Sequence, residues 1–232
     1  MIRLTKYGIR EWLGSAILAL LLNCGFVFIA LYVNAPIGWT LLGITTAGWL
    51  SLAAFFRVPS RKIPAGQHLI VSPADGMIKD IELLKNVKLD CFGTVDVIRI
   101  GIFISLLDAH INRAPAEFTV ECKKYRPGKF YDASDESSVI VNESMMISGT
   151  ANAAGIKFPI GIKQLSRAIA KRIVCQVEPY ESKLKKGEIY GMIKFGSRIE
   201  LYLPASKKFE IKVKIGDRVF AGSTVMAEIK KG

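Results

Sequence analysis

The sequence predicts a mainly β protein with few helices, preceded by an N-terminal hydrophobic helical hairpin. Residues 13–33 and 34–56 of the 232-residue chain contain no charged side chain. From Arg57 onward, short β-type runs alternate with Gly, Pro and Asp turns. The length fits one compact domain with a small additional element. We therefore divide the chain into residues 1–64, a membrane hairpin with a basic exit, and residues 65–232, a β-rich domain.

Each apolar stretch is long enough to cross a bilayer, which takes roughly 20 apolar residues in a helix. The region from Asn34 to Gly38, with Pro36, is predicted to form a tight turn between two helices. A cleaved signal peptide is a poorer interpretation, because there is no small-residue cleavage site and a second apolar stretch follows. A hairpin that lies in one leaflet without crossing remains the alternative. By the positive-inside rule, the flanking basic residues place both ends and the following domain in the cytosol; they are Arg3, Lys6, Arg10, Arg57, Arg61 and Lys62.

The β-rich domain is predicted to contain one helix, across about Lys163–Lys171, among many strands. Its bounding Gly, Pro and Asp residues predict turns between short strands rather than long helices. The predicted strands are Gln67–Ser72, Val95–Ile104, Phe118–Cys122, Ser138–Ser148, Ile199–Leu203 and Phe209–Val213.

Composition restricts the partners, the redox state of the cysteines and the metal sites that we expect. The net charge of +12 favours anionic partners such as nucleic acid, an anionic membrane or acidic small molecules. No nucleic-acid-binding motif accompanies that charge, so we expect no nucleic-acid partner. The four cysteines are scattered without CxxC spacing, which predicts reduced thiols in a domain facing the cytosol. Because the chain has only two histidines, His68 and His110, we expect no structural metal site.

Two segments near the C-terminus resemble one another. Leu184–Ile193 and Val213–Gly222 each place a glycine turn between β-branched runs. Their spacing is similar to that of the β-hammerhead halves in biotinyl and lipoyl carrier domains, which carry a lysine at the hairpin tip between them. The predicted tip here is Lys194–Arg198, without the Met-Lys-Met arrangement, so we expect no biotin or lipoyl arm.

The predicted tip carries Gly196-Ser197, which has a distinctive possible chemistry. The Ser197 hydroxyl can attack the Gly196 carbonyl carbon, which replaces the amide bond by an ester. β-Elimination then releases the Gly196 carboxylate and leaves dehydroalanine, which hydrolyses to a pyruvoyl group and ammonia. This ketone can form a Schiff base with a substrate amine and act as an electron sink. Gly-Ser is also common in simple turns, so the dipeptide alone does not establish this chemistry.

The surrounding motifs resemble those of phosphatidylserine decarboxylase proenzymes, and most closely the short, archaetidylserine decarboxylase-like branch of that family. The resemblance covers almost the whole chain, with several motifs in the same order. They are Tyr7-Gly8, Phe55–Pro64, Ser72–Gly76, Asp108–Pro115, Asn142-Glu143, Ala168–Ile173 with Arg172, Gly191–Ile193, Phe195–Arg198 and Leu201–Pro204.

The resemblance implies a lyase that decarboxylates phosphatidylserine to phosphatidylethanolamine and CO₂ in phospholipid biosynthesis. Autocatalytic cleavage of this zymogen at Gly196–Ser197 would give a β subunit, residues 1–196, and an α subunit, residues 197–232. These would remain together as a heterodimer, with a homo-oligomer also possible. The cofactor would be a covalent pyruvoyl group derived from Ser197. The substrate would be a membrane phospholipid, and the catalytic domain would lie on the cytoplasmic side of the cell membrane.

The resemblance also implies roles for individual residues. Asp75 matches the aspartate of the family's Asp-His-Ser processing triad. Longer members carry an H-x-x-H pattern whose second histidine belongs to the triad, whereas this chain has His110 followed by Arg113. We therefore assign proton transfer to His110, oriented by Asp75, since an imidazole titrates near neutrality and arginine stays protonated. Arg113 and Asn112 are expected to bind substrate, with the Arg113 guanidinium holding a phosphate or carboxylate.

Three other functions remain open from the sequence. The same chemistry could act on an ether-linked serine lipid, because the serine head is identical. A soluble pyruvoyl amino-acid decarboxylase would share Ser197 but would not need the apolar hairpin. A carrier or scaffold protein would share the glycine turns, but it needs a modifiable lysine at the tip.

Overall fold

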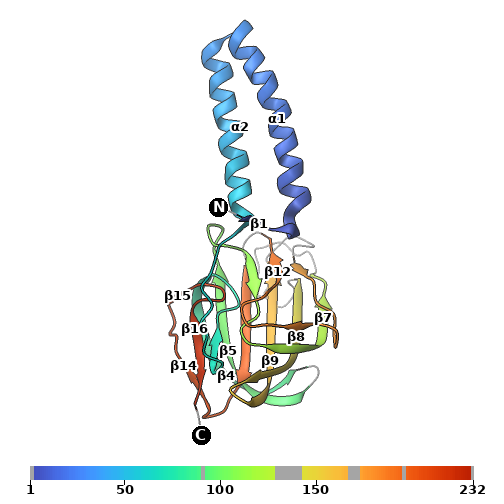
Figure 1. Cartoon of the computed structure of the whole chain (residues 1–232), viewed down its shortest axis with the longest axis vertical. Helices are drawn as coiled ribbons and strands as arrows, with labels where there is room; N and C mark the ends of the chain where they lie inside the picture. Colours follow the sequence, from blue (N-terminus) through green and yellow to red (C-terminus); the bar gives the residue numbers. More distant parts are fainter. Residues whose placement is uncertain (1–2, 90–91, 129–142, 167–172, 195–196, 231–232) are drawn as a thin grey trace. The chain divides into compact units, whose positions relative to one another are not determined.

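The computed structural model describes residues 3–89, 92–128, 143–166, 173–194 and 197–230. The chain forms two compact units, Met1–Pro59 and Ser60–Gly232 (Figure 1). Arg61, Ile63 and Pro64, which belong to the predicted basic exit, lie in the second unit.

The first unit is a helical hairpin, as predicted. Helices α1 (Ile9–Tyr32) and α2 (Ala35–Phe55) follow a short 3₁₀ turn, η1 (Lys6–Gly8), and the two-residue strands β1 (Arg3–Leu4) and β2 (Arg57–Val58) pair antiparallel. The Asn34 side chain caps α2 by accepting a hydrogen bond from the Ile37 N–H at 3.1 Å. The chain therefore turns at Val33 and Asn34, and the predicted turn is wrong over Ala35–Gly38, which form the first turn of α2. Both helices are long and apolar enough to cross a membrane, which indicates membrane association.

Polar contacts join the two helices within this apolar unit. Asn23 Nδ2 donates to Thr46 Oγ1 at 3.0 Å, and Trp49 Nε1 donates to the Trp12 carbonyl at 3.3 Å. In an apolar environment a polar side chain is best satisfied by a partner on the neighbouring helix. These contacts therefore help to fix the pairing of α1 with α2.

The second unit is built from antiparallel strands, which confirms the predicted fold class. Its largest sheet is curled and has eight strands in the order β11-β7-β8-β9-β13-β5-β4-β15, and two three-stranded sheets have the orders β10-β12-β6 and β14-β16-β3 (Figure 1). The strands are β3 (Leu69–Val71), β4 (Gly76–Leu89), β5 (Gly93–Ile104), β6 (Ile111–Arg113), β7 (Phe118–Arg126), β8 (Ser144–Ala153), β9 (Ile156–Ser166), β10 (Ile173–Cys175), β11 (Lys183–Leu184), β12 (Ile189–Ile193), β13 (Ser197–Pro204), β14 (Phe209–Ile211), β15 (Arg218–Val219) and β16 (Val225–Ile229).

The core of this unit lies on one face of the large sheet. Ile100 and Ile102 of β5 are opposite Leu201 and Ile199 of β13, and all four side chains are fully buried. Directly opposed residues share a face, and successive residues alternate between faces. Ser197, two residues before Ile199, therefore points toward this core.

Several predicted strands overlap observed ones, but the predicted helix is wrong where it can be compared. Lys163–Ser166 continue strand β9, because they pair with β8 on one side and β13 on the other. The remainder of that predicted helix lies outside the described residues, as does the first part of the predicted strand Ser138–Ser148. The long strand β4 was not predicted.

The two similar C-terminal segments do contain equivalent turns. Gly187 and Gly216 both have positive φ, 79° and 93°, which a glycine adopts without steric cost. In each turn an acidic side chain accepts from the backbone N–H three residues earlier: Glu188 from Lys185 and Asp217 from Lys214. The strands between these turns do not form one hairpin, since β12 pairs with β10 and β6, whereas β13 pairs with β5 and β9.

The predicted reduced state of the cysteines is wrong at one position. Cys122 is disulfide-bonded, whereas Cys24 and Cys175 are free. Cys91 lies outside the described residues. Burial raises the pKa of the Cys175 thiol to about 11, which makes it a poor nucleophile at neutral pH.

Candidate active site

Ser197 is the first residue of β13, a central strand of the large sheet. Its Cα partners are Ile104 on β5 and Ser166 on β9. The residue is only 1 % exposed, so the prediction that Ser197 lies at a hairpin tip is wrong. The difference arises because β13 is paired on both sides and directs Ser197 into the core. Gly196 lies outside the described residues.

A second buried hydroxyl lies opposite Ser197. Ser166 is also 1 % exposed, and neither hydroxyl has a hydrogen-bond partner within the described part of the chain. Opposed residues on antiparallel strands hold their Cβ atoms about 4.5–5.5 Å apart on one face of the sheet. The backbone N–H of Ser166 donates to the Glu143 carbonyl at 2.9 Å. The Ser166 hydroxyl was not predicted, because its strand was predicted to be a helix.

A buried amide pair lies on the same sheet face. Gln164 precedes Ser166 by two residues on β9, and its Nε2 atom donates to Asn112 Oδ1 on β6 at 2.7 Å. Both side chains are fully buried. Asn112 Nδ2 and Gln164 Oε1 have no partner among the described residues, so this pair retains one donor and one acceptor. Asn112 was expected at the site, whereas Gln164 was not.

His110 is fully buried immediately before β6. Its Nδ1 atom lies 2.9 Å from the Asp108 carbonyl oxygen, and its own carbonyl accepts from the Ile193 N–H at the end of β12. A carbonyl can only accept, so Nδ1 carries the proton when the ring is neutral. The Nε2 atom of that tautomer is then the basic nitrogen.

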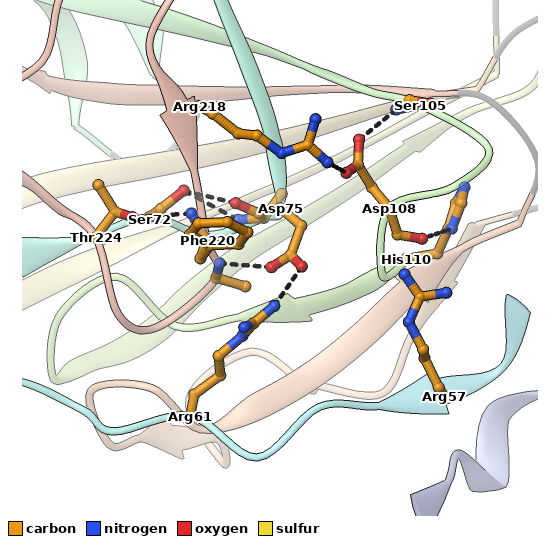
Figure 2. Close-up of polar contacts among 12 residues, drawn as sticks. Arg57, Arg61, Ser72, Asp75, Ser105, Asp108, His110, Arg218, Phe220 and Thr224 are labelled. Atoms are coloured by element: carbon orange, nitrogen blue, oxygen red, sulfur yellow. Dashed lines mark hydrogen bonds and ion pairs between the residues drawn. The ribbon is translucent and has the colours of Figure 1, made fainter. Parts of the chain in front are cut away.

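Asp108 has an unexpected role, because its motif was used only to locate His110. Figure 2 shows its carboxylate held from two sides: Oδ2 accepts from the Ser105 N–H at 2.9 Å, and Oδ1 pairs with Arg218 at 2.5 Å. Asp108 is buried although Arg218 is largely exposed. The loop that carries His110 is therefore fixed by both the main chain and the side chain of Asp108.

Asp75 is buried between β3 and β4, where both carboxylate oxygens are engaged. Oδ1 accepts from the Ala221 N–H at 2.7 Å, and Oδ2 accepts from Arg61 at 2.5 Å (Figure 2). Burial raises the pKa of Asp75 above its ordinary value, and the Ala221 N–H and the Arg61 charge offset part of that rise. Arg61 also lies 5.0 Å from the centre of the Phe220 ring. The structure thus connects Asp75 to Arg61 and Ala221.

Arg113 lies on β6 beside the same carboxylate. Its Nη1 atom donates to the Gly187 carbonyl at 2.9 Å. Burial lowers the pKa of Arg113, with the Arg61 charge acting in the same direction and Asp75 opposing both. The guanidinium is still charged at neutral pH, because arginine starts from a very high pKa. It is therefore a fixed positive charge near Asp75.

The part of the chain after Ser197 supplies contacts to the buried carboxylates of Asp75 and Asp108. Arg218 binds Asp108 and Ala221 binds Asp75, while the Gly222 N–H donates to the Ser72 carbonyl at 2.8 Å. Of the other predicted motifs, Glu143 is buried and its carboxylate accepts from Tyr125 at 3.1 Å. Asn142 and Arg172 lie outside the described residues.

The residues of this region suit nucleophilic and acid–base chemistry. They place a buried serine hydroxyl, a second hydroxyl and an amide pair on one sheet face, and His110 is joined through its carbonyl to the strand that precedes the serine. A buried serine whose hydroxyl makes no hydrogen bond to the described residues also fits the position of a serine-derived carbonyl group.

Comparison with known proteins gives one consistent family. Residues 51–227 match the family model described as phosphatidylserine decarboxylase. The chain is similar to phosphatidylserine decarboxylase proenzymes of Rickettsia bellii (36 % identity over 215 residues, 88 % of each chain) and Carboxydothermus hydrogenoformans (39 % over 203 residues, 82 % of this chain and 90 % of the relative). It is also similar to that of Ehrlichia canis (37 % over 212 residues, 89 % of this chain and 90 % of the relative). The chain belongs to the phosphatidylserine decarboxylase proenzyme family.

Proposed function

We propose that this chain is a self-cleaving, pyruvoyl-dependent decarboxylase that converts phosphatidylserine to phosphatidylethanolamine and CO₂. The observation that carries the proposal is Ser197: a buried hydroxyl, without a partner among the described residues, at the start of a central strand. A serine that served only as a turn residue would be exposed or would bond to its own backbone. Family membership supplies the reaction for which such a buried serine is suited.

Self-cleavage at Gly196–Ser197 is the first part of the proposal. Ser197 Oγ attacks the preceding carbonyl carbon, and His110 is the proposed acceptor of its proton at Nε2. Ser166 Oγ, opposite Ser197, and Asn112 Nδ2, whose side chain is bonded to Gln164 of the same sheet face, are buried donors suited to bond the oxygen that gains negative charge. The products are residues 1–196 and 197–232.

The second part concerns the group left at residue 197. A pyruvoyl group supplies an electron sink for the electrons of the broken bond to CO₂. The Asn112 amide and the Ser166 hydroxyl would donate hydrogen bonds to the oxygen atoms of the pyruvoyl group. The surrounding isoleucine and leucine side chains exclude water. His110 then provides a proton at Nε2. Arg113 contributes fixed positive charge for the phosphate or carboxylate of the substrate.

Location forms a separate part of the proposal. The two apolar helices would hold the enzyme at the membrane that contains its lipid substrate. Basic residues on both flanks of the hairpin support a cytoplasmic catalytic unit. The disulfide at Cys122 counts against a reducing compartment, so the side needs a direct test. Protease digestion of sealed membrane vesicles of each orientation should cleave the β-rich unit only where it is accessible.

Mass spectrometry of the purified full-length protein tests the chemistry. The wild type should give two fragments that separate between Gly196 and Ser197, with a ketone in place of the amino group at residue 197. Ser197→Ala should give one intact, inactive chain. Ser148→Ala is a matched control, since Ser148 is also fully buried in the large sheet, and it should be cleaved normally. Cleavage of Ser197→Ala would end the proposal. Assays with ester-linked and ether-linked serine lipids then compare the two lipid classes.

A further inference from the structure

Arg198, the residue directly after Ser197, is bound unusually firmly. Successive strand residues point to opposite faces, so its side chain lies on the sheet face away from the core. There its Nη1 and Nη2 atoms donate to the two carboxylate oxygens of Asp80 at 2.6 and 2.7 Å, while Nε donates to Glu200 at 2.9 Å. A bidentate guanidinium–carboxylate pair is stronger and more directional than a single ion pair.

The partners of Arg198 are themselves held. Tyr202 donates to the second oxygen of Glu200 at 2.6 Å, and Arg99 contacts Glu82 at 2.9 Å and Asp80 at 3.5 Å. The Glu200 side chain is 8 % exposed and that of Arg198 is 30 % exposed. The hydrogen bond from Arg198 lowers the pKa of Asp80. An isolated surface ion pair contributes little, but this one is partly buried and belongs to a network.

The sheet leaves space for this contact. Asp80 is on β4 and Arg198 is on β13, with β5 between them. A Cβ atom on Gly101 of β5 would lie 2.3 Å from Arg198 Nη2 and 2.6 Å from Asp80 Oδ1. Any larger residue at position 101 would therefore displace the ion pair. The Arg198 side chain crosses β5 at Gly101, because glycine has no Cβ atom to block it.

The need for such a contact arises after cleavage. In the precursor, residue 197 is held by the chain on both sides. In the product it is a chain end, and chain ends of a strand fray readily. Asp80 belongs to the large fragment and Arg198 to the small one, so their ion pair joins the two fragments next to that end.

We propose that the bidentate Arg198–Asp80 pair is a positioning device that holds the newly formed chain end in the sheet, with residue 197 buried at the active site. The inference rests on the proposed cleavage between Gly196 and Ser197. Arg198 does not touch the reacting atoms. It acts by keeping β13 paired with β5 and β9 up to its first residue.

The test uses full-length protein in detergent and two readouts that should move in opposite directions. Arg198→Gln should still be cleaved, but its chain end should open more often. The carbonyl at residue 197 should then react with phenylhydrazine about tenfold faster, followed by hydrazone absorbance, while kcat falls by about tenfold, which corresponds to about 1.4 kcal/mol. Arg198→Lys keeps the charge without the fork and should be intermediate.

Further variants separate this role from general destabilisation. Asp80→Asn should reproduce both changes, and the double variant should add little to either, because both substitutions remove the same contact. Arg99→Gln removes neighbouring ion pairs but leaves Arg198 bound to Asp80, and both rates should stay within about twofold of wild type.

The outcomes are distinguishable. An uncleaved wild type would remove the proposed function itself. A cleaved Arg198→Gln and Asp80→Asn with wild-type hydrazine reactivity and kcat would overturn the positioning role while leaving the proposed function intact. The positioning role would also be overturned if both folded variants, but not Arg99→Gln, failed to cleave, since the ion pair would then act on the precursor.

Discussion

At the scale of single residues, the candidate site is a set of polar groups that the core does not need. The polar groups of Ser197, Ser166, Asn112 and Gln164 are buried, and each of these side chains has an atom without a partner among the described residues. Such an atom costs about 1–3 kcal/mol of folding free energy. Apolar residues would pack the same sheet face at lower cost. The concentration of these buried polar groups around one strand end is therefore best explained by chemistry performed there.

Replacing His110 tests the base. His110→Ala should slow cleavage by about 10²–10⁴-fold, the usual contribution of acid–base catalysis, and should also reduce turnover of any cleaved protein. The reason is that Nε2 is the basic nitrogen of the tautomer set by the Asp108 carbonyl. A time course of precursor and product bands on a gel measures the first effect.

His68→Ala is the matched control for that experiment. His68 is the other histidine and lies at the surface, 3.6 Å from Glu228, so its loss should change neither rate. If His110→Ala is cleaved and turns over like the wild type, histidine has no part in the mechanism. Asp75 would then be the first residue to examine as the base.

Ser166→Ala should separate stability from activity. Removing a buried hydroxyl that lacks a partner in the described structure should raise the free energy of unfolding by up to about 1 kcal/mol. Cleavage should nevertheless slow by about tenfold or more, because a proposed donor opposite Ser197 is lost. Thermal melting and the gel assay measure the two effects. Ser148→Ala should show the stability change alone; unchanged cleavage in Ser166→Ala would exclude that hydroxyl from the chemistry.

The sequence could locate some of these residues but not others. Ser197, His110, Asp75 and Asn112 are in local motifs that can be recognised without knowing the fold. Ser166 and Gln164 become visible only when β9 is known to pair with β13. The contact of Asp75 with Ala221 was also out of reach, because Ala221 is contributed from a distant part of the chain.

At the scale of elements, the turn region around β15 (Arg218–Val219) organises the site. It is attached to β4 by the Asp217 carbonyl, which accepts from the Ile78 N–H at 2.9 Å, and by the Gly216 N–H, which donates to the Ile78 carbonyl at 2.9 Å. From this base Arg218 reaches Asp108 and Ala221 reaches Asp75. After cleavage, the small fragment would thus supply both the reactive residue and the contacts that hold two buried carboxylates of the large one.

Replacing Arg218 tests this organisation. Arg218→Gln removes the charged partner of Asp108 and should cost about 1–2 kcal/mol of stability, a value reduced because Arg218 is largely exposed. Cleavage should slow by several-fold, since the Asp108 loop orients His110. Arg218→Lys should recover part of the rate. A stability loss without any effect on cleavage would show that this ion pair is only structural.

At the scale of the whole molecule, the predicted features are those encoded locally. The pair of apolar helices follows from composition and was predicted, whereas the short β1–β2 pair at its base was not. Strand β4 was missed because its outward face carries charges such as Lys79, Asp80 and Glu82, which interrupt the apolar pattern. The predicted helix is wrong over Lys163–Ser166 for a related reason, because pairing with two neighbouring strands overrides local preference.

Separating the two units gives the last prediction. Among the described residues, the main buried core is formed by side chains from Ile70 onward, so a chain beginning at Ser60 should fold without the helical hairpin. It should lose membrane association and still cleave at Gly196–Ser197, because Arg61 remains to bind Asp75. Fractionation, circular dichroism and the gel assay measure these properties.

A chain beginning at Ala65 is the matched comparison, because it lacks both Arg61 and Ile63. The Ile63 side chain packs close to two glycines: a Cβ atom at Gly187 or Gly222 would lie within 3 Å of it. That chain should cleave at least about tenfold more slowly, because the buried Asp75 carboxylate loses its charged partner. Equal cleavage by both chains would show that Arg61 is dispensable for processing, and a folded but uncleaved Ser60 chain would show that the first unit takes part in the chemistry.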